Sequence, residues 1–214
     1  MTQNLGLARR FQERVHSYIN MGLLNESAQL KKDWRTFSYI LSTVPIADLY
    51  HITSSQNVQS IFEHGGLISR KTQDSTGFLA SYRAQQSPDT AIKYDHCVHL
   101  SFCRDISILK ELEKQNEHAV LLTIDPIAAL LKGTIFLHCD TSGDDPSTQL
   151  SEYESTESLL KINFDAELNS LSVPLEILGL QETPDQNAKI LVPNKVPSFL
   201  IKNIKFISSG IVNK

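Results

Sequence analysis

The stretch Leu49–Asn57 reads LYHITSSQN and joins an apolar run to the expected start of a helix. Side chains alternate between the two faces of a β-strand, so we expect His51 and Thr53 on one face and Tyr50 and Ile52 on the other. One face of this strand then carries polar groups where the chain turns into its next element. Taken alone, a histidine here is more often a hydrogen-bonded residue at a strand end than a binding residue.

The composition limits the class of protein. The chain has 214 residues, 41% of them hydrophobic, which is enough for a core in one or two domains. The net charge of -4 does not attract nucleic acid or anionic membranes globally, so such binding needs a local patch. The three cysteines form no CxxC pair, which suits a reducing cytoplasm. No segment approaches the roughly 18 apolar residues of a membrane span, and we therefore expect a cytoplasmic protein without membrane association.

The first part of the chain is predicted to be helical. Two groups of apolar residues recur at helical spacing between about residues 5 and 41. They are Phe11, Val15, Tyr18 and Ile19, followed by Leu30, Trp34, Phe37 and Ile40. We predict a helical N-terminal appendage over residues 1–46 and a main domain over residues 47–214.

A short helix is expected directly after the opening stretch. Ser54 or Ser55 is a suitable N-cap, and the pair Gly65-Gly66 is a suitable C-terminal stop. From there to about Asp95 the sequence is polar and lacks periodicity, which predicts a long loop.

The second half is predicted to be rich in strands. Five short β-branched or aromatic segments are bounded by Asp, Gly, Pro and Asn. They cover residues 97–102, 118–124, 133–139, 189–192 and 203–208. Two helices are expected between them, one over residues 105–115 with Asp105 as its cap and one over residues 126–133 closed by Gly133.

Charge is unevenly distributed towards the C-terminus. Residues 141–185 contain ten acidic residues and one basic residue, whereas residues 186–214 contain five lysines and no acidic residue. The simpler interpretation is a solvated acidic segment followed by lysines at strand ends. The functional interpretation is a basic rim beside a site for a polyanion.

Several common kinds of site are not supported by the sequence. It has no phosphate-binding glycine loop and no HExxH helix. His96 and His99 could in principle contact one ion, but His99 alternates with apolar neighbours, which favours a core or edge histidine and no metal site. Cys97 and Cys103 flank an apolar strand, and nothing indicates an activated thiol.

Four segments together resemble a known family. They are LYHITSSQNVQSIFEHGGLIS, VHLSF, TIFLHCDTSGDD and NAKILVPNKVPSFLIKNI, in this order from about Leu49 to Ile207. They are similar to DarT-type ADP-ribosyltransferases, bacterial toxins that transfer ADP-ribose from NAD to bases of single-stranded DNA. The resemblance implies an α+β ADP-ribosyltransferase-like fold of two small packed β-sheets with flanking helices.

The resemblance also implies roles for particular residues. His51 and Thr53 would contact the ribose and nicotinamide portions of NAD, and Asn57 would help to place the dinucleotide. An arginine in the following loop would pair with the phosphates or orient the reacting groups, for which a guanidinium is well suited. Its spacing from the histidine makes Arg83 the first candidate and Arg70 the second.

The late strand departs from the family pattern. The family carries its catalytic glutamate before an apolar triplet, and this chain has Lys189 at that position, before Ile190, Leu191 and Val192. A lysine offers no hydrogen-bond acceptor and repels positive charge on the departing sugar. Removal of one such contribution commonly lowers the rate on the order of a hundredfold to a thousandfold.

Three explanations of Lys189 are open. It is an introduced inactivating change, or the chain is a natural degenerate member that still binds NAD or nucleic acid. Alternatively, another carboxylate such as Glu182 or Asp185 has taken over, which is the weakest option because a loop residue is harder to hold in place.

The expected function is a mono-ADP-ribosyltransferase toxin acting on a nucleobase of single-stranded DNA, in a toxin–antitoxin or phage-defence system. The resemblance implies a macrodomain-type antitoxin as partner. Modification of RNA and a non-catalytic NAD or nucleic-acid binding module are the alternatives.

Overall fold

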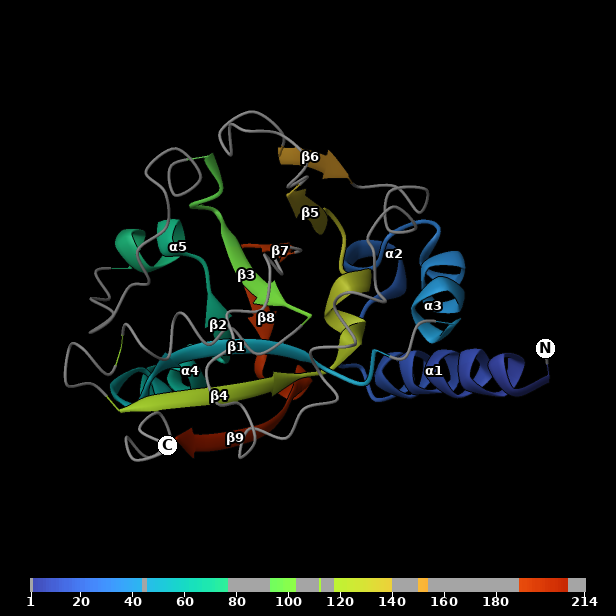
Figure 1. The fold of residues 1–214 in the computed structure, drawn as a ribbon, viewed down its shortest axis with the longest axis horizontal. Helices are drawn as coiled ribbons and strands as arrows, with labels where there is room; N and C mark the ends of the chain where they lie inside the picture. The colour runs from blue at the N-terminus through green and yellow to red at the C-terminus, as the bar shows by residue number, and fades with distance from the viewer. Residues whose placement is uncertain are drawn as a thin grey trace.

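Seven strands form an antiparallel sheet in the order β6-β5-β7-β3-β1-β4-β9 (Figure 1). The structure is a computed structural model that describes residues 2–43, 46–76, 93–102, 112, 118–139, 150–153 and 189–207. The strands are β1 Leu49–Ser54, β3 Cys97–Ser101, β4 Ala119–Ile124, β5 Ile135–Cys139, β6 Leu150–Tyr153, β7 Lys189–Pro193 and β9 Ile201–Ile207. A separate two-stranded sheet joins β2, Gly66–Ile68, to β8, Lys195–Pro197.

The helices are short except at the N-terminus. The α-helices are α1 Thr2–Asn20, α2 Glu26–Gln29, α3 Trp34–Thr43, α4 Val58–Glu63 and α5 Arg70–Ser75. The 3-10 helices are η1 Ser55–Asn57, η2 Pro126–Leu130 and η3 Ser198–Leu200. No helix in the described part of the chain is long and apolar enough to cross a membrane.

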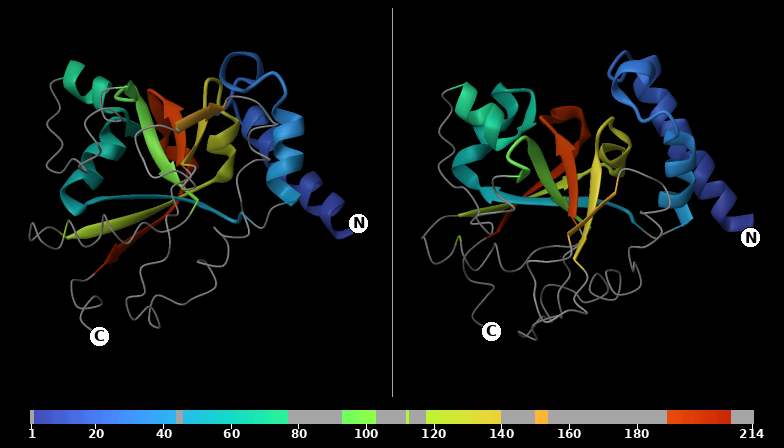
Figure 2. Two further views of the ribbon diagram at one scale, coloured as in Figure 1. Left: turned by 45° about the horizontal axis from the view of Figure 1, so that its top comes forward. Right: turned by 90° about the horizontal axis from the view of Figure 1, so that it is seen from above.

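The seven-stranded sheet consists of two groups of strands that meet at one residue pair. Tyr50 of β1 pairs with Ser101 of β3, whereas β1 and β4 pair along their whole length. Figures 1 and 2 show β1, β4 and β9 lying side by side, while β3 runs obliquely to them. The expected α+β class is confirmed. The two small packed sheets that we expected correspond to these two groups of strands, which belong to one sheet.

The alternation expected for the opening strand is present. Leu49 belongs to the main core, whereas Tyr50 and Ile52 belong to a second cluster with Leu121 and Leu112. The polar residues of β1 therefore do not share a face with Tyr50 and Ile52.

The N-terminal helices share the main core with the sheet. Phe37 of α3 stacks on Phe136 of β5 with ring centroids 5.8 Å apart, and Trp34 is buried beside them in the same cluster. Lys31 is buried as well, and its Nζ atom donates to the Thr134 carbonyl at 2.6 Å. The boundary between residues 46 and 47 as a domain limit stays a prediction.

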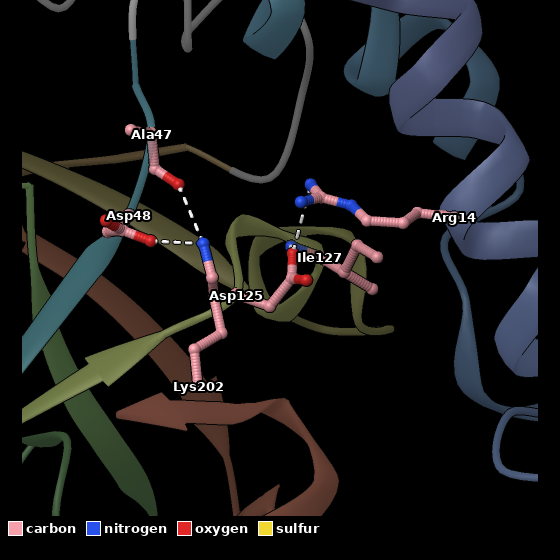
Figure 3. A network of polar contacts seen from close by, with 6 residues as sticks. All are labelled: Arg14, Ala47, Asp48, Asp125, Ile127 and Lys202. Carbon is pink, nitrogen blue, oxygen red and sulfur yellow. Dashed lines mark hydrogen bonds and ion pairs between the residues drawn. The ribbon is translucent and has the colours of Figure 1, made fainter. Parts of the chain in front are cut away.

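Asp125 attaches α1 to the sheet (Figure 3). Its carboxylate is 2% exposed, lies 3.4 Å from the Arg14 guanidinium and accepts from the Ile127 N–H at 3.0 Å. Tyr18 of α1 hydrogen-bonds the same carboxylate, and burial raises the pKa of Tyr18. In the same region Lys202 of β9 pairs with Asp48.

Gly65 and Gly66 end α4 as the sequence predicts. Gly65 has φ of 66°, a left-handed conformation that follows many helices. Gly66 has φ of 145°, and a Cβ atom there would lie 2.1 Å from the Val196 carbonyl oxygen. Lys195 Nζ donates to the His64 carbonyl at 2.6 Å, which satisfies the end of the helix.

Two predictions of local structure need correction, and a third lies outside the described residues. The expected loop after β2 is wrong at its start, because Arg70–Ser75 forms α5, with the Ser69 hydroxyl accepting from the Thr72 N–H at 3.3 Å. The helix expected after β4 is a 3-10 helix rather than an α-helix. The helix expected over residues 105–115 lies outside the described residues, apart from Leu112.

Candidate active site

His51 lies immediately beyond the single residue pair between β1 and β3. Its Nδ1 atom is 2.9 Å from the backbone carbonyl of His99, which can only accept, so Nδ1 carries the proton. Burial lowers the pKa of His51, while the bond to the His99 carbonyl acts in the opposite direction. The ring is therefore neutral and its orientation is fixed.

Thr53 and Asn57 form a buried polar pair at the end of the same strand. The Asn57 side-chain amide donates to the Thr53 hydroxyl at 2.9 Å, and both residues are buried. The Ser54 hydroxyl caps η1 by accepting from the Gln56 N–H at 3.2 Å, which turns the chain so that Asn57 reaches back to Thr53. Ser54, one of the two predicted N-cap serines, thus caps the 3-10 helix that leads into α4, whereas α4 itself has Asn57 as its N-cap without a side-chain hydrogen bond.

His99 lies at the centre of this region, on β3. Val98 and Leu100 point into the main core, so His99 occupies the opposite face of the strand. Its Nε2 atom lies 3.3 Å from the Tyr94 carbonyl. Burial lowers the pKa of His99 to about 4; the Tyr94 carbonyl opposes this, and the basic groups of Lys189, His51 and Arg70 add to it. His99 is therefore neutral near pH 7.

Lys189 begins β7 and faces the same side of the sheet as His99. It pairs with Ser101 of β3, and Leu191, two residues further along, pairs with His99. Residues two apart on one strand share a face, and residues paired across strands do too. The lysine side chain is partly exposed and near enough to His99 to depress its pKa.

Arg70 is brought to this region by α5. The Lys71 N–H donates to the Asp95 carbonyl at 2.9 Å, and the Ser69 N–H donates to the Asn194 carbonyl at 2.7 Å. These bonds fasten the start of α5 to the segments that precede β3 and follow β7. Arg83, the first candidate arginine, lies outside the described residues, as do Glu182 and Asp185.

In the structure, three of the site residues expected from the sequence lie around His99, which the sequence did not indicate as part of this site. His51, Arg70 and Lys189 lie around His99, while Thr53 and Asn57 form their pair at the end of β1. The alternation in CVHLS placed His99 on the face opposite the core residues, but only the pairing of β3 with β7 brings it to Lys189.

Other chemistry is not supported by the described residues. They contain no group of three or more His, Cys, Asp or Glu side chains that could hold a metal ion. Cys97 is buried, and burial together with Asp95 raises the pKa of its thiol to about 11. A raised pKa disfavours the thiolate form of Cys97, and Cys103 lies outside the described residues.

Two of the C-terminal lysines have structural partners. Lys195 donates to the end of α4, and Lys202 pairs with Asp48. For these two lysines the simpler interpretation of the charge pattern holds. The acidic residues 141–185 lie outside the described residues except for residues 150–153.

Comparison with protein families identifies one match. A model described as "ssDNA thymidine ADP-ribosyltransferase, DarT" matches residues 50–214. The chain belongs to the DarT family. It is therefore a member of a family of NAD-dependent ADP-ribosyltransferases, and the expected family and cofactor class are confirmed.

Solved DarT structures have the same fold. A Thermus sp. 2.9 DarT in complex with ADP-ribosylated ssDNA has a TM-score of 0.54 and 16% identity, over 78% of this chain and 84% of that chain. The same Thermus protein in complex with NAD+ has a TM-score of 0.51 and 16% identity, over 78% and 85%. A Thermosipho africanus DarTG in complex with ADP-ribose has a TM-score of 0.53 and 14% identity, over 77% of this chain and 45% of that chain. A comparison with curated proteins finds no match.

The DarT match includes Lys189 and the five other candidate residues, which are His51, Thr53, Asn57, Arg70 and Arg83. Helices α1, α2 and α3 precede it. Helices α1 and α3 pack into the same hydrophobic core as the matched residues.

Proposed function

We propose that this chain is built as a mono-ADP-ribosyltransferase for thymidine in single-stranded DNA and that Lys189 impairs its reaction. Membership of the DarT family supports the reaction and the acceptor. The position of Lys189 carries the second part of the proposal. It opens the late strand, on the face that also carries His99, where the family pattern places its glutamate.

The reaction itself explains why a lysine is unfavourable. The glycosidic bond of NAD breaks, nicotinamide leaves with the bonding electrons, and the base forms a new bond to the ribose and releases a proton. The sugar becomes cation-like in the transition state, so a nearby carboxylate stabilises it. The ammonium of Lys189 cannot accept the ribose hydroxyl hydrogen bond and opposes the developing charge.

The neighbouring residues are suited to holding the substrate. His51 is neutral with its proton on Nδ1, so Nε2 presents a lone pair to a ribose hydroxyl or amide donor. The Thr53 hydroxyl accepts from Asn57 and retains its own proton to donate. We assign His51, Thr53 and Asn57 to the placement of NAD, with Arg70 or Arg83 for its phosphates.

Transfer by the Lys189→Glu variant tests this function. Oligonucleotides of single-stranded DNA and RNA, each lacking one base type, are incubated with NAD and weighed by mass spectrometry. We expect a gain of one ADP-ribose unit on DNA that contains thymidine and none on DNA without it. A gain on RNA alone would replace the DNA proposal with the RNA alternative, and loss of the signal in Arg83→Ala would support the arginine assignment.

A non-catalytic binding module is the second candidate, and Lys189 is the observation that favours it. Binding needs only the shape and polarity of the site, whereas turnover needs the carboxylate. If Lys189→Glu transfers nothing to any oligonucleotide while NAD still binds, the binding module replaces the enzyme.

We further propose the biological setting that the resemblance implies. It is a cytoplasmic toxin, restrained by a macrodomain-type antitoxin, in a toxin–antitoxin or phage-defence system. The match to a structure described as DarTG supports this setting. Harmless expression of a transfer-competent Lys189→Glu variant without any antitoxin would contradict it.

A further inference from the structure

Basic groups lie around His99 in the candidate site. Lys189 shares its face through the β3–β7 register, His51 bonds its carbonyl, and α5 brings Arg70 close to it. These three groups lower the pKa of His99 through their charge, whereas the carboxylate of Asp95 acts on Cys97, two residues before it. At neutral pH the two histidines are uncharged, so Lys189 and Arg70 are the charged groups that act on His99.

The positive charge of Lys189 and Arg70 should affect the binding of ADP-ribose, NAD+ and NADH differently. ADP-ribose and NAD+ share the adenosine, the two phosphates and the second ribose. NAD+ also carries the nicotinamide ring, which is a cation, so ADP-ribose has one more negative charge. NADH retains the ring in an uncharged form. A site with Lys189 in the place of a carboxylate attracts the more negative ligands and repels the cationic ring.

We propose that the site of this chain selects ADP-ribose over NAD+, the reverse of what a transferase requires of its substrate. The inference rests on the proposed function, because it needs the site to accept this dinucleotide. It makes the chain a receptor for the ADP-ribosyl group rather than a consumer of NAD+. The class of ligand is then ADP-ribose, free or attached to a nucleic acid.

The expected preference arises because ADP-ribose and NAD+ differ by one unit of charge, which interacts with the partly exposed ammonium of Lys189. With the effective dielectric of such a site and a separation of several ångströms, the difference is about tenfold in Kd. Salt screens part of it, so the preference should shrink as ionic strength rises.

Titration calorimetry of the full-length chain with ADP-ribose, NAD+ and NADH tests the proposal. We expect ADP-ribose and NADH each to bind about tenfold more tightly than NAD+. In Lys189→Glu the order should reverse for ADP-ribose and NAD+. Lys205→Glu is the matched control, because Lys205 is exposed on β9, four strands from β7 in the order of the sheet. It should keep the order of the unmodified chain.

The ligand comparison on the unmodified chain does not depend on the folding of any variant. Equal affinity for the three ligands, or tighter binding of NAD+, would overturn the inference. If Lys189→Glu transfers ADP-ribose while the unmodified chain shows no preference, the inference alone fails and the proposed function stands. Absence of binding and of transfer in both proteins would overturn both.

Discussion

The Nδ1 atom of His51 lies 2.9 Å from the backbone carbonyl oxygen of His99. This bond continues the connection between β1 and β3 just beyond their one backbone pair, Tyr50 with Ser101. A side chain thus links the two groups of strands where their backbones diverge. The bond fixes the orientation of the ring that we assign to NAD, and ligand binding and stability measured on the same His51 variant distinguish its two roles.

Replacement of His51 by alanine should weaken the binding of NAD far more than it lowers the melting temperature. A well-buried hydrogen bond to the ligand contributes on the order of 1.5 to 3 kcal/mol. Calorimetry and thermal unfolding measure the two effects. His96→Ala is the control, since the His96 side chain is half-exposed beside Asp95 and its loss should change neither. A loss of stability as large as the loss of binding would assign His51 to the fold instead.

Stability should fall as the pH is lowered from about 7 to about 4. The pKa of His99 is about 4 in the folded protein and about 6.5 when unfolded, so the unfolded chain takes up the proton first. The stabilisation is complete above pH 6.5 and is lost as the pH falls towards 4, by about 3 kcal/mol at most. Urea unfolding at a series of pH values should show a shallower dependence in His99→Gln. Parallel curves for the two proteins would contradict the assignment.

Asp125→Ala should destabilise the protein by about 2 to 4 kcal/mol. The change removes the cap of η2 and leaves Arg14 and Tyr18 of α1 without their shared acceptor. Asp48→Ala, which breaks only a surface pair with Lys202, should cost less than about 1 kcal/mol. Denaturant unfolding of both variants gives the comparison, and equal costs would show that α1 does not depend on Asp125.

The substitution Gly66→Ala should be severely destabilising, by more than about 3 kcal/mol, because the new Cβ atom meets the Val196 carbonyl in an already strained conformation. Gly22→Ala is a matched control with φ of 70° and nothing within 4 Å of its Cβ position. It should cost only about 1 kcal/mol. Similar melting temperatures for the two variants would refute the close approach of β2 and β8.

The strands were predictable because their residues alternate between two faces. The apolar positions of VHLSF and KILV predict strands regardless of partners, and the serine and glycines around α4 predict its ends. Helix α5 was missed because RKTQDS has no apolar stripe, and only the capping serine before it signals a helix. Short polar helices of this kind depend on tertiary bonds, here from Lys71 to Asp95.

The site was predictable only in part, for a physical reason. His51, Thr53 and Asn57 lie within seven residues, so local geometry relates them. His99 and Lys189 are ninety positions apart and meet through the register of β3 and β7. The sequence of one strand does not show which distant strand pairs with it. The role of His99 could therefore be recognised only from the structure.

Release of nicotinamide from NAD in the presence of thymidine-containing single-stranded DNA shows whether Lys189 blocks the active site. We expect Lys189→Glu to release nicotinamide and to modify the DNA at least about a hundredfold faster than the unmodified chain. Lys189→Gln, which removes the charge without supplying a carboxylate, should remain much closer to the unmodified chain. Equal rates for the unmodified chain and Lys189→Glu, with both proteins folded and binding NAD, would contradict the claim that Lys189 blocks an otherwise intact active site.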